Sequence, residues 1–187
     1  GTAVTIPSVA NVTGHTFILQ GLAQGATMLT VSAPGYVTNT QTVTVDPSGF
    51  VIASSDSLDT NTFAANVQVT IGAGRLNPGT LTWSGSVQKV RAGLTVDVPV
   101  TSSNPTVGAI TISPVGFAAN VSLVSTFFDP LTAGTTTLAA GTPSGFDTPS
   151  TSRQATATVT APAIAAPVNP RIGEDLQDDF TVALTTA

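Results

Sequence analysis

The stretch Leu94-Thr95-Val96-Asp97-Val98-Pro99-Val100-Thr101 decides the fold class of this chain. Apolar residues alternate in it with polar residues or proline, and this period of two places one face of a β-strand in a core and the other in solvent. Proline has no backbone N–H to donate to a sheet, so Pro99 predicts an edge strand or a bulge at that point. The stretch therefore indicates a β-sheet with one buried and one solvent-exposed face.

The same alternation recurs along the chain between clusters of turn-forming residues. It is present in Leu29/Val31, Val43/Val45, Val67/Val69/Ile71, Leu81/Trp83, Ile110/Ile112, Val121/Leu123 and Phe180/Val182/Leu184. The turn clusters are Ala33-Pro34-Gly35, Asp46-Pro47-Ser48-Gly49, Asn77-Pro78-Gly79, Ser103-Asn104-Pro105 and Thr142-Pro143-Ser144-Gly145. Short strands with such regular turns are typical of a β-sandwich.

The composition agrees with an all-β chain and argues against several classes of function. Of the 187 residues, 41% are hydrophobic and only 8% are charged, so solubility rests on the hydroxyl groups of Thr and Ser. The net charge is −5 and the five basic residues form no cluster, which argues against a nucleic-acid partner. No apolar stretch reaches the roughly 20 residues of a membrane span, and no signal peptide is recognisable. We therefore expect an interior piece of a longer chain, without membrane insertion.

An internal repeat is the strongest signal in the sequence. Residues Thr16-Phe17, Leu22, Gly25, Thr27, Leu29, Pro34 and Tyr36 are echoed by Thr126-Phe127, Leu131, Gly134, Thr136, Leu138, Pro143 and Phe146. A second echo pairs Ile71-Gly72 with Ile172-Gly173. Both offsets are on the order of 100 residues, the size of one immunoglobulin-like unit.

The repeat predicts one complete unit and two partial ones. We place the later strands of one immunoglobulin-like unit at 1–47, a complete unit at 48–162 and the opening strands of the next unit at 163–187. The Pro- and Ala-rich sequence 161–167 has the character of a stiff connector. A partial unit exposes an apolar face, so we expect this chain to pack against neighbouring repeats or copies of itself.

The chain resembles a family, the bacterial immunoglobulin-like (Big-type) tandem repeats of large secreted and surface-anchored proteins. The resemblance rests on Val100-Thr101-Ser102-Ser103-Asn104-Pro105 followed by Val107, on Ala133-Gly134-Thr135-Thr136-Thr137-Leu138, and on Gly25-Ala26-Thr27-Met28-Leu29-Thr30-Val31 leading to Ala33-Pro34-Gly35-Tyr36. It covers nearly the whole chain. The middle unit departs from the commonest members by an extra leading segment, 46–66.

What the resemblance implies is an architectural or adhesive role outside a bacterial cell. In this family such modules serve as spacers, stalks, adhesin shafts, or lattice and filament components. The leading prediction is thus an extracellular or cell-surface structural array, possessing no catalytic residues and in contact with its own repeats and with other surface polymers. The alternative is an adhesin or carbohydrate-binding module, whose loops would be rich in aromatic and charged groups.

The chemistry-bearing residues are few. His15 is the only histidine and the chain has no cysteine, which argues against an acid–base catalytic site and against zinc or redox chemistry. Trp83 alternates with Thr82 and Ser84 beside Leu81, as a core residue does, so we expect it in a core rather than on a sugar-stacking surface.

One acidic cluster suggests a weak calcium site at the start of the third unit. Glu174, Asp175, Asp178 and Asp179 lie just after the connector. Calcium prefers six to eight oxygen ligands, and carboxylates at a junction could bridge neighbouring units. The spacing lacks the D-x-[DN]-x-[DN]-G pattern, so a solvated loop is the favoured interpretation. Asp56 and Asp59 permit the same two interpretations and also favour a loop.

Overall fold

The computed structural model describes residues 4–6 and 14–185. These residues form β-strands and no helix, which confirms the predicted all-β class. The chain divides into two compact units, Gly1–Val45 and Asp46–Ala187. The predicted boundary between 162 and 163 lies inside the second unit. Among the described residues there is no helix of the length and apolar character needed to cross a membrane.

The first unit contains one antiparallel hairpin, in which β1 (Gly25–Val31) pairs with β2 (Asn39–Val45) along their full lengths. The second unit begins with β3 (Ser48–Ile52), β4 (Ser57–Asn61), β5 (Val67–Leu76), β6 (Trp83–Val87), β7 (Val96–Val98) and β8 (Val100–Ser102). It continues with β9 (Gly108–Ile110), β10 (Val115–Phe117), β11 (Leu123–Pro130), β12 (Gly134–Ala140), β13 (Gln154–Thr160), β14 (Ala163–Ala165) and β15 (Ala183–Thr185).

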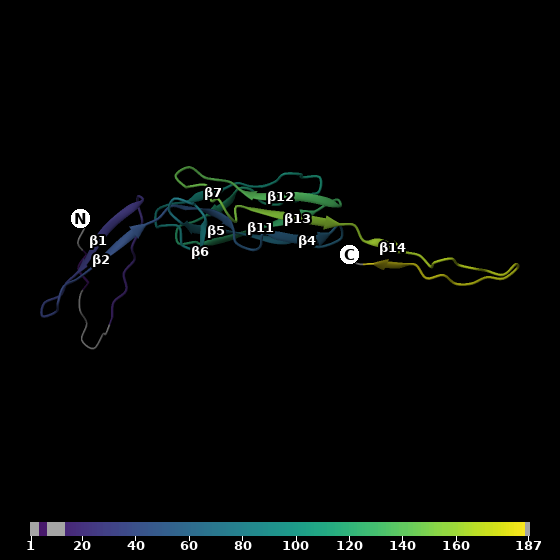
Figure 1. Ribbon diagram of the computed structural model, residues 1–187, viewed down its shortest axis with the longest axis horizontal. Helices are drawn as coiled ribbons and strands as arrows, with labels where there is room; N and C mark the ends of the chain where they lie inside the picture. The colour runs from purple at the N-terminus through teal and green to yellow at the C-terminus, as the bar shows by residue number, and fades with distance from the viewer. Residues whose placement is uncertain (1–3, 7–13, 186–187) are drawn as a thin grey trace. The chain divides into compact units, whose positions relative to one another are not determined.

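Two sheets form a β-sandwich between residues 46 and 160, as the sequence predicted (Figure 1). One sheet has the order β3-β5-β11-β9, with β6 also paired to β5, and the other has the order β4-β13-β12-β8. Neighbouring strands are antiparallel except β4 and β13, which are parallel. The chain passes from the first sheet to the second between β3 and β4, so its opening strands belong to both layers. Two further ladders, β7 with β10 and β14 with β15, lie outside these sheets.

The core of the sandwich is built from the inward residues of both sheets and of the β7–β10 ladder. Phe50, Phe117 and Phe128 are its largest members, each no more than 1% exposed. The ring of Phe50 contacts the rings of Phe117 and Phe146, at centroid distances of 4.9 and 4.8 Å. Burying an aliphatic or aromatic side chain of this size stabilises a fold by about 1.5–3 kcal/mol, so these rings are major contributors to stability.

The stretch that decides the fold class forms two strands rather than one. Val96, Val98 and Val100 are all buried, as the alternation predicts. The strand breaks at Pro99, however: β7 before it pairs with β10, and β8 after it pairs with β12. Proline has no N–H to donate to a ladder, and the chain changes its partner strand at this residue. The Pro99 carbonyl oxygen still accepts a hydrogen bond from the Gly141 N–H at 2.7 Å.

Several alternating positions lie outside the strands. Leu81, Ile112, Val121, Phe180 and Val182 are in connecting segments. Leu81 has a φ of 54°, a left-handed conformation that interrupts an extended strand, so the prediction of a strand through Leu81 and Trp83 is wrong at its first residue. Asp59 lies in β4 instead of in the predicted loop.

Candidate functional site

The β1–β2 hairpin carries apolar residues on one face that the described residues of its own unit cover only in part: Leu29, Val43 and Val45 are partly buried and Val31 is 54% exposed. Because side chains alternate across a strand, Leu29, Val31, Val43 and Val45 share one face. The polar residues Thr27, Asn39 and Gln41 lie on the same face, and the other face carries Met28 and several threonines. On that second face the Thr30 and Thr40 hydroxyl groups lie 3.4 Å apart. A two-stranded hairpin is marginally stable alone in water, so this face is a candidate interaction surface.

The sandwich contains a second hairpin built in the same way. In the first hairpin Gly25 lies opposite Val45 and Ala26 opposite Thr44; in the second, Gly134 lies opposite Val159 and Thr135 opposite Thr158. Both glycines have positive φ, 136° and 153°, values that favour glycine. The β1–β2 hairpin is therefore the structural counterpart of β12–β13.

The turns of the two hairpins also begin alike. The Tyr36 N–H donates to the Ala33 carbonyl at 3.1 Å, and the Phe146 N–H donates to the Pro143 carbonyl at 3.3 Å. A glycine with positive φ, 81° at Gly35 and 85° at Gly145, precedes the aromatic residue in each case. The predicted repeat thus corresponds to a shared local structure.

The two hairpins differ in what covers them. Leu138 of β12 is fully buried by the opposite sheet, whereas its counterpart Leu29 is only partly buried and Val31 is 54% exposed. The aromatic residues that follow differ likewise, because Phe146 packs on Phe50 while Tyr36 is 80% exposed. Further exposed apolar residues of the first unit are Phe17, Ile18, Leu19, Leu22 and Val37. The first unit therefore leaves exposed several large apolar side chains of the kind that the sandwich buries.

A short connection follows each of these hairpins. Asp46 and Pro47 separate β2 from β3, and Ala161 and Pro162 separate β13 from β14. The first connection is tied to β5: the Arg75 guanidinium donates to the Asp46 carboxylate at 2.7 Å, and the Leu76 N–H donates to the Pro47 carbonyl at 2.8 Å. In both places a two-residue, proline-containing connection joins one hairpin to the next strand.

The acidic cluster lies in the exposed segment between β14 and β15. Glu174, Asp175, Asp178 and Asp179 are all exposed, and the Asp179 N–H donates to the Asp178 carboxylate at 2.9 Å. Within the described part of the chain, no three His, Asp or Glu side chains are grouped closely enough to hold a metal ion. The structure thus does not bring these four carboxylates together as one ligand set.

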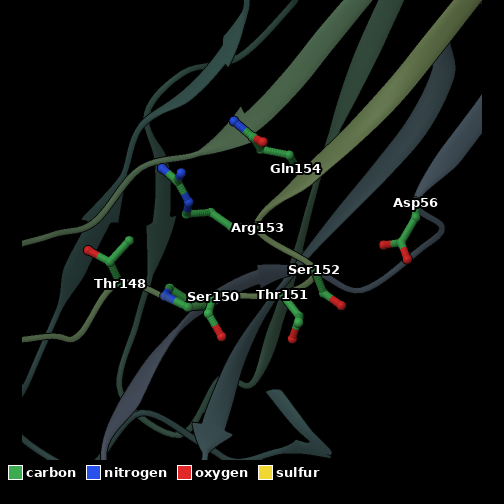
Figure 2. A pocket seen from close by; sticks show the side chains of 8 residues that line it. Asp56, Thr148, Ser150, Thr151, Ser152, Arg153 and Gln154 are labelled. Carbon is green, nitrogen blue, oxygen red and sulfur yellow. The ribbon is translucent and has the colours of Figure 1, made fainter. Parts of the chain in front are cut away.

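A polar hollow of about 550 Å³ opens on the loop before β13 (Figure 2). Its lining residues are Asp56, Thr148, Pro149, Ser150, Thr151, Ser152, Arg153 and Gln154. Figure 2 shows Asp56 and Arg153 on different sides of the hollow, with the arginine side chain extending away from the aspartate. The lining contains no aromatic ring and no histidine, and His15 is an exposed residue of the first unit. The hollow therefore offers neither a sugar-stacking platform nor a general base of the imidazole type.

Trp83 is partly buried on the outer face of a sheet, so its predicted place in the core is wrong. Its ring lies over Gly74, where an added Cβ would come within 2.9 Å of two ring atoms. Its indole N–H donates to the Ser86 carbonyl at 3.2 Å. Because Gly74 has no side chain, the ring covers β5 from outside, and an apolar layer with Val51 forms there.

Comparisons with known proteins give limited matches. No protein-family model matches the chain, and no curated protein sequence matches it. Among solved structures the chain is similar to domains 4 and 5 of the S-layer protein SbsC, with 15% identity, a TM-score of 0.42 and coverage of 74% of this chain and 66% of that one. It is also similar to domains 1–6 of the surface layer protein SbsC, with 16% identity, a TM-score of 0.41 and coverage of 78% and 18%. The chain thus spans less than two thirds of either structure.

Proposed function

We propose that this chain is a load-bearing structural part of a serial array of immunoglobulin-like sandwiches outside a bacterial cell, such as a filament, stalk, sheath or surface layer. The single observation that carries the proposal is the parallel ladder between β4 and β13. These are the second strand and the last strand of the sandwich; the chain enters through β3 of the other sheet and leaves after β13. The resemblance to bacterial immunoglobulin-like repeats supports the extracellular location.

A parallel ladder between β4 and β13 resists a pull on the chain ends once β3, the first strand, has come away from β5. A force applied before β4 and after β13 draws the two strands past one another, so that the ladder hydrogen bonds are loaded together. The ladder joins Ser57–Asn61 to 156–160. It is extended by the Thr62 N–H, which donates to the Thr160 carbonyl at 3.0 Å, and by the Thr160 hydroxyl, which donates to the Thr60 carbonyl at 3.1 Å. This arrangement suits a module that transmits tension.

The short connections support the same proposal. Two residues with a proline at each junction leave little chain for free movement, because proline fixes φ near −65°. Arg75 and Asp46 hold the first connection to the sandwich by a charge-assisted hydrogen bond. A serial array needs such short links if tension is to pass from unit to unit.

Single-molecule pulling on the chain ends tests the proposal. Thr62→Pro removes the N–H that donates to Thr160 at the loaded ladder, and we expect it to lower the unfolding force. Thr111→Pro is the matched control: Thr111 also follows a short strand, and its N–H donates to the Phe127 carbonyl at 2.9 Å, away from β4 and β13. Equal losses of force in the two variants, at matched losses of thermal stability, would overturn the load-bearing role.

A further inference from the structure

We propose that the apolar residues Leu29, Val31, Val43 and Val45 of the β1–β2 hairpin are covered by residues 163–185 of a second copy of this chain, so that chains join end to end. The inference rests on the proposed structural function and names its partner. It is based on a comparison within the chain: β12–β13, the structural counterpart of β1–β2, is covered by the opposite sheet of the sandwich.

The sandwich shows what covers such a hairpin. The strands β12 and β13 lie against β3 of the opposite sheet, and Phe50 of β3 reaches the core beside Leu138. Phe50 also packs on Phe146, the aromatic residue after the β12 turn. The strand that opens a sandwich therefore lies over the hairpin that ends it. For β1–β2, the equivalent cover is an opening strand of the same kind.

The segment after residue 160 supplies an opening strand. As β3 follows β2 after two residues, β14 follows β13 after two residues, each connection ending in proline. Ile164 is the one large apolar residue of β14 and is 69% exposed, while Tyr36, the counterpart of Phe146, is 80% exposed. Ile164 of β14 and Tyr36 in the turn of the β1–β2 hairpin are thus both exposed in a single chain.

The two ends of the chain are complementary in the strands that they carry. Before the sandwich stand the counterparts of β12 and β13, preceded by 16–22, which echoes the end of β11. After it stand β14, which follows β13 at the spacing at which β3 follows β2, and Ile172-Gly173, which echoes Ile71-Gly72 of β5 in sequence but lies outside the strands. In the sandwich β3, β5 and β11 are neighbours in one sheet, and β12 and β13 are neighbours in the other. The strands without a counterpart include the edge strands β8 and β9 and the separate pair β7 and β10.

The strands β1 and β2 and the strands β14 and β15 are also electrostatically compatible. No charged residue is present in β1, β2, β14 or β15. Burying these strands against one another removes no ionised side chain of theirs from water, and the charged residues between β14 and β15 stay in solvent if only the strands form the contact. The apolar residues Leu29, Val31, Val43 and Val45 would supply the contact.

Directed cross-linking of the 187-residue chain tests the proposal, because the chain contains no cysteine of its own. Two separately purified variants, Leu29→Cys and Ile164→Cys, are mixed and oxidised. We expect a disulfide-linked pair that contains one chain of each variant. Met28→Cys, on the opposite face of β1, replaces Leu29→Cys in the control and should give at least tenfold less of the mixed product.

Sedimentation of the unmodified chain gives the second readout. We expect its average mass to rise with concentration, and Leu29→Asp to abolish the rise while Met28→Asp preserves it. Fluorescence of Trp83 reports whether the sandwich stays folded in each variant. Leu29→Cys chains that link only to each other, or a chain that stays monomeric at high concentration, would overturn the end-to-end pairing. The load-bearing role would survive either result, because the pulling experiment tests it on single chains.

Discussion

Leu29 and Leu138 occupy the same position in two hairpins, each four residues after a glycine of positive φ that lies opposite a valine. Leu138 is fully buried, while Leu29 is only partly buried by the described residues of its unit. One chain thus contains a covered and an uncovered form of one structural element. The covered form indicates which contacts stabilise the sandwich, and the predictions below concern those contacts and the sites around them.

Phe128 is expected to be a major source of stability. Its ring is fully buried in the core, so Phe128→Ala should lower the free energy of unfolding by about 3–5 kcal/mol. Phe63 is 85% exposed, and Phe63→Ala should change it by less than about 0.5 kcal/mol. Urea unfolding followed by Trp83 fluorescence measures both values. Similar losses of unfolding free energy in the two variants would contradict the placement of Phe128 in the core and of Phe63 at the surface.

The buried hydroxyl of Thr136 is expected to hold the turn after β8. Its Oγ1 accepts from the Asn104 N–H at 2.8 Å and lies 2.8 Å from the Ser102 hydroxyl. Thr136→Val keeps the shape but leaves that N–H without its acceptor, so we expect a loss of about 1–3 kcal/mol in the free energy of unfolding. Thr135→Val, on the exposed face of the same strand, is the control. Chemical denaturation that gives equal midpoints for both variants would contradict this role.

The position of Trp83 can be tested by its own fluorescence, since it is the only tryptophan. An added Cβ in Gly74→Ala would meet the indole at 2.9 Å and push it towards water. We expect the emission maximum to move to longer wavelength. Gly116→Ala, whose Cβ would come no closer than 3.4 Å to the Asp97 carboxylate, should leave the spectrum unchanged. An unshifted spectrum in Gly74→Ala would mean that the ring lies elsewhere.

Calcium is expected to have no specific site at Glu174, Asp175, Asp178 and Asp179. The described residues include no group of three carboxylates close enough to share an ion. Titration calorimetry of the chain with calcium should therefore give only the heat of dilution, and a parallel titration with magnesium should give the same. Saturable heat that disappears in Asp178→Asn and Asp179→Asn would instead establish the junction site suggested by the sequence.

Much of the fold could be predicted from the sequence, because repetition and alternation are properties of the sequence itself. The echo of Gly25 and Leu29 by Gly134 and Leu138 corresponds to two hairpins of equal register. The ladder change at Pro99 could not be predicted, since Val98 and Val100 keep the same inward alternation on both sides of it. Proline marks the position, but only the partner strands show that two ladders meet there.

The place of Trp83 could not be predicted for a different reason. An alternating pattern tells which residues share a face, but it does not tell which face of a sheet lies against the other sheet. Gly72 and Gly74 leave room on the outer face of β5, and an apolar layer of Val51, Val87 and Trp83 fills it. Glycines at alternate positions of a long strand were the signal for this layer. That residues 1–47 are a partial unit with an exposed apolar face stays a prediction; in the structure Val31 is 54% exposed and Leu29 is partly buried.

Cryo-electron microscopy of the native material that carries this sequence tests the central claim most directly. A serial structural array predicts sandwiches repeating along a fibre or lattice, with the Leu29 face of β1–β2 covered by strands of a neighbouring segment or chain. Separate particles in which this face meets only solvent, and in which the polar hollow beside Arg153 holds a ligand, would contradict the claim.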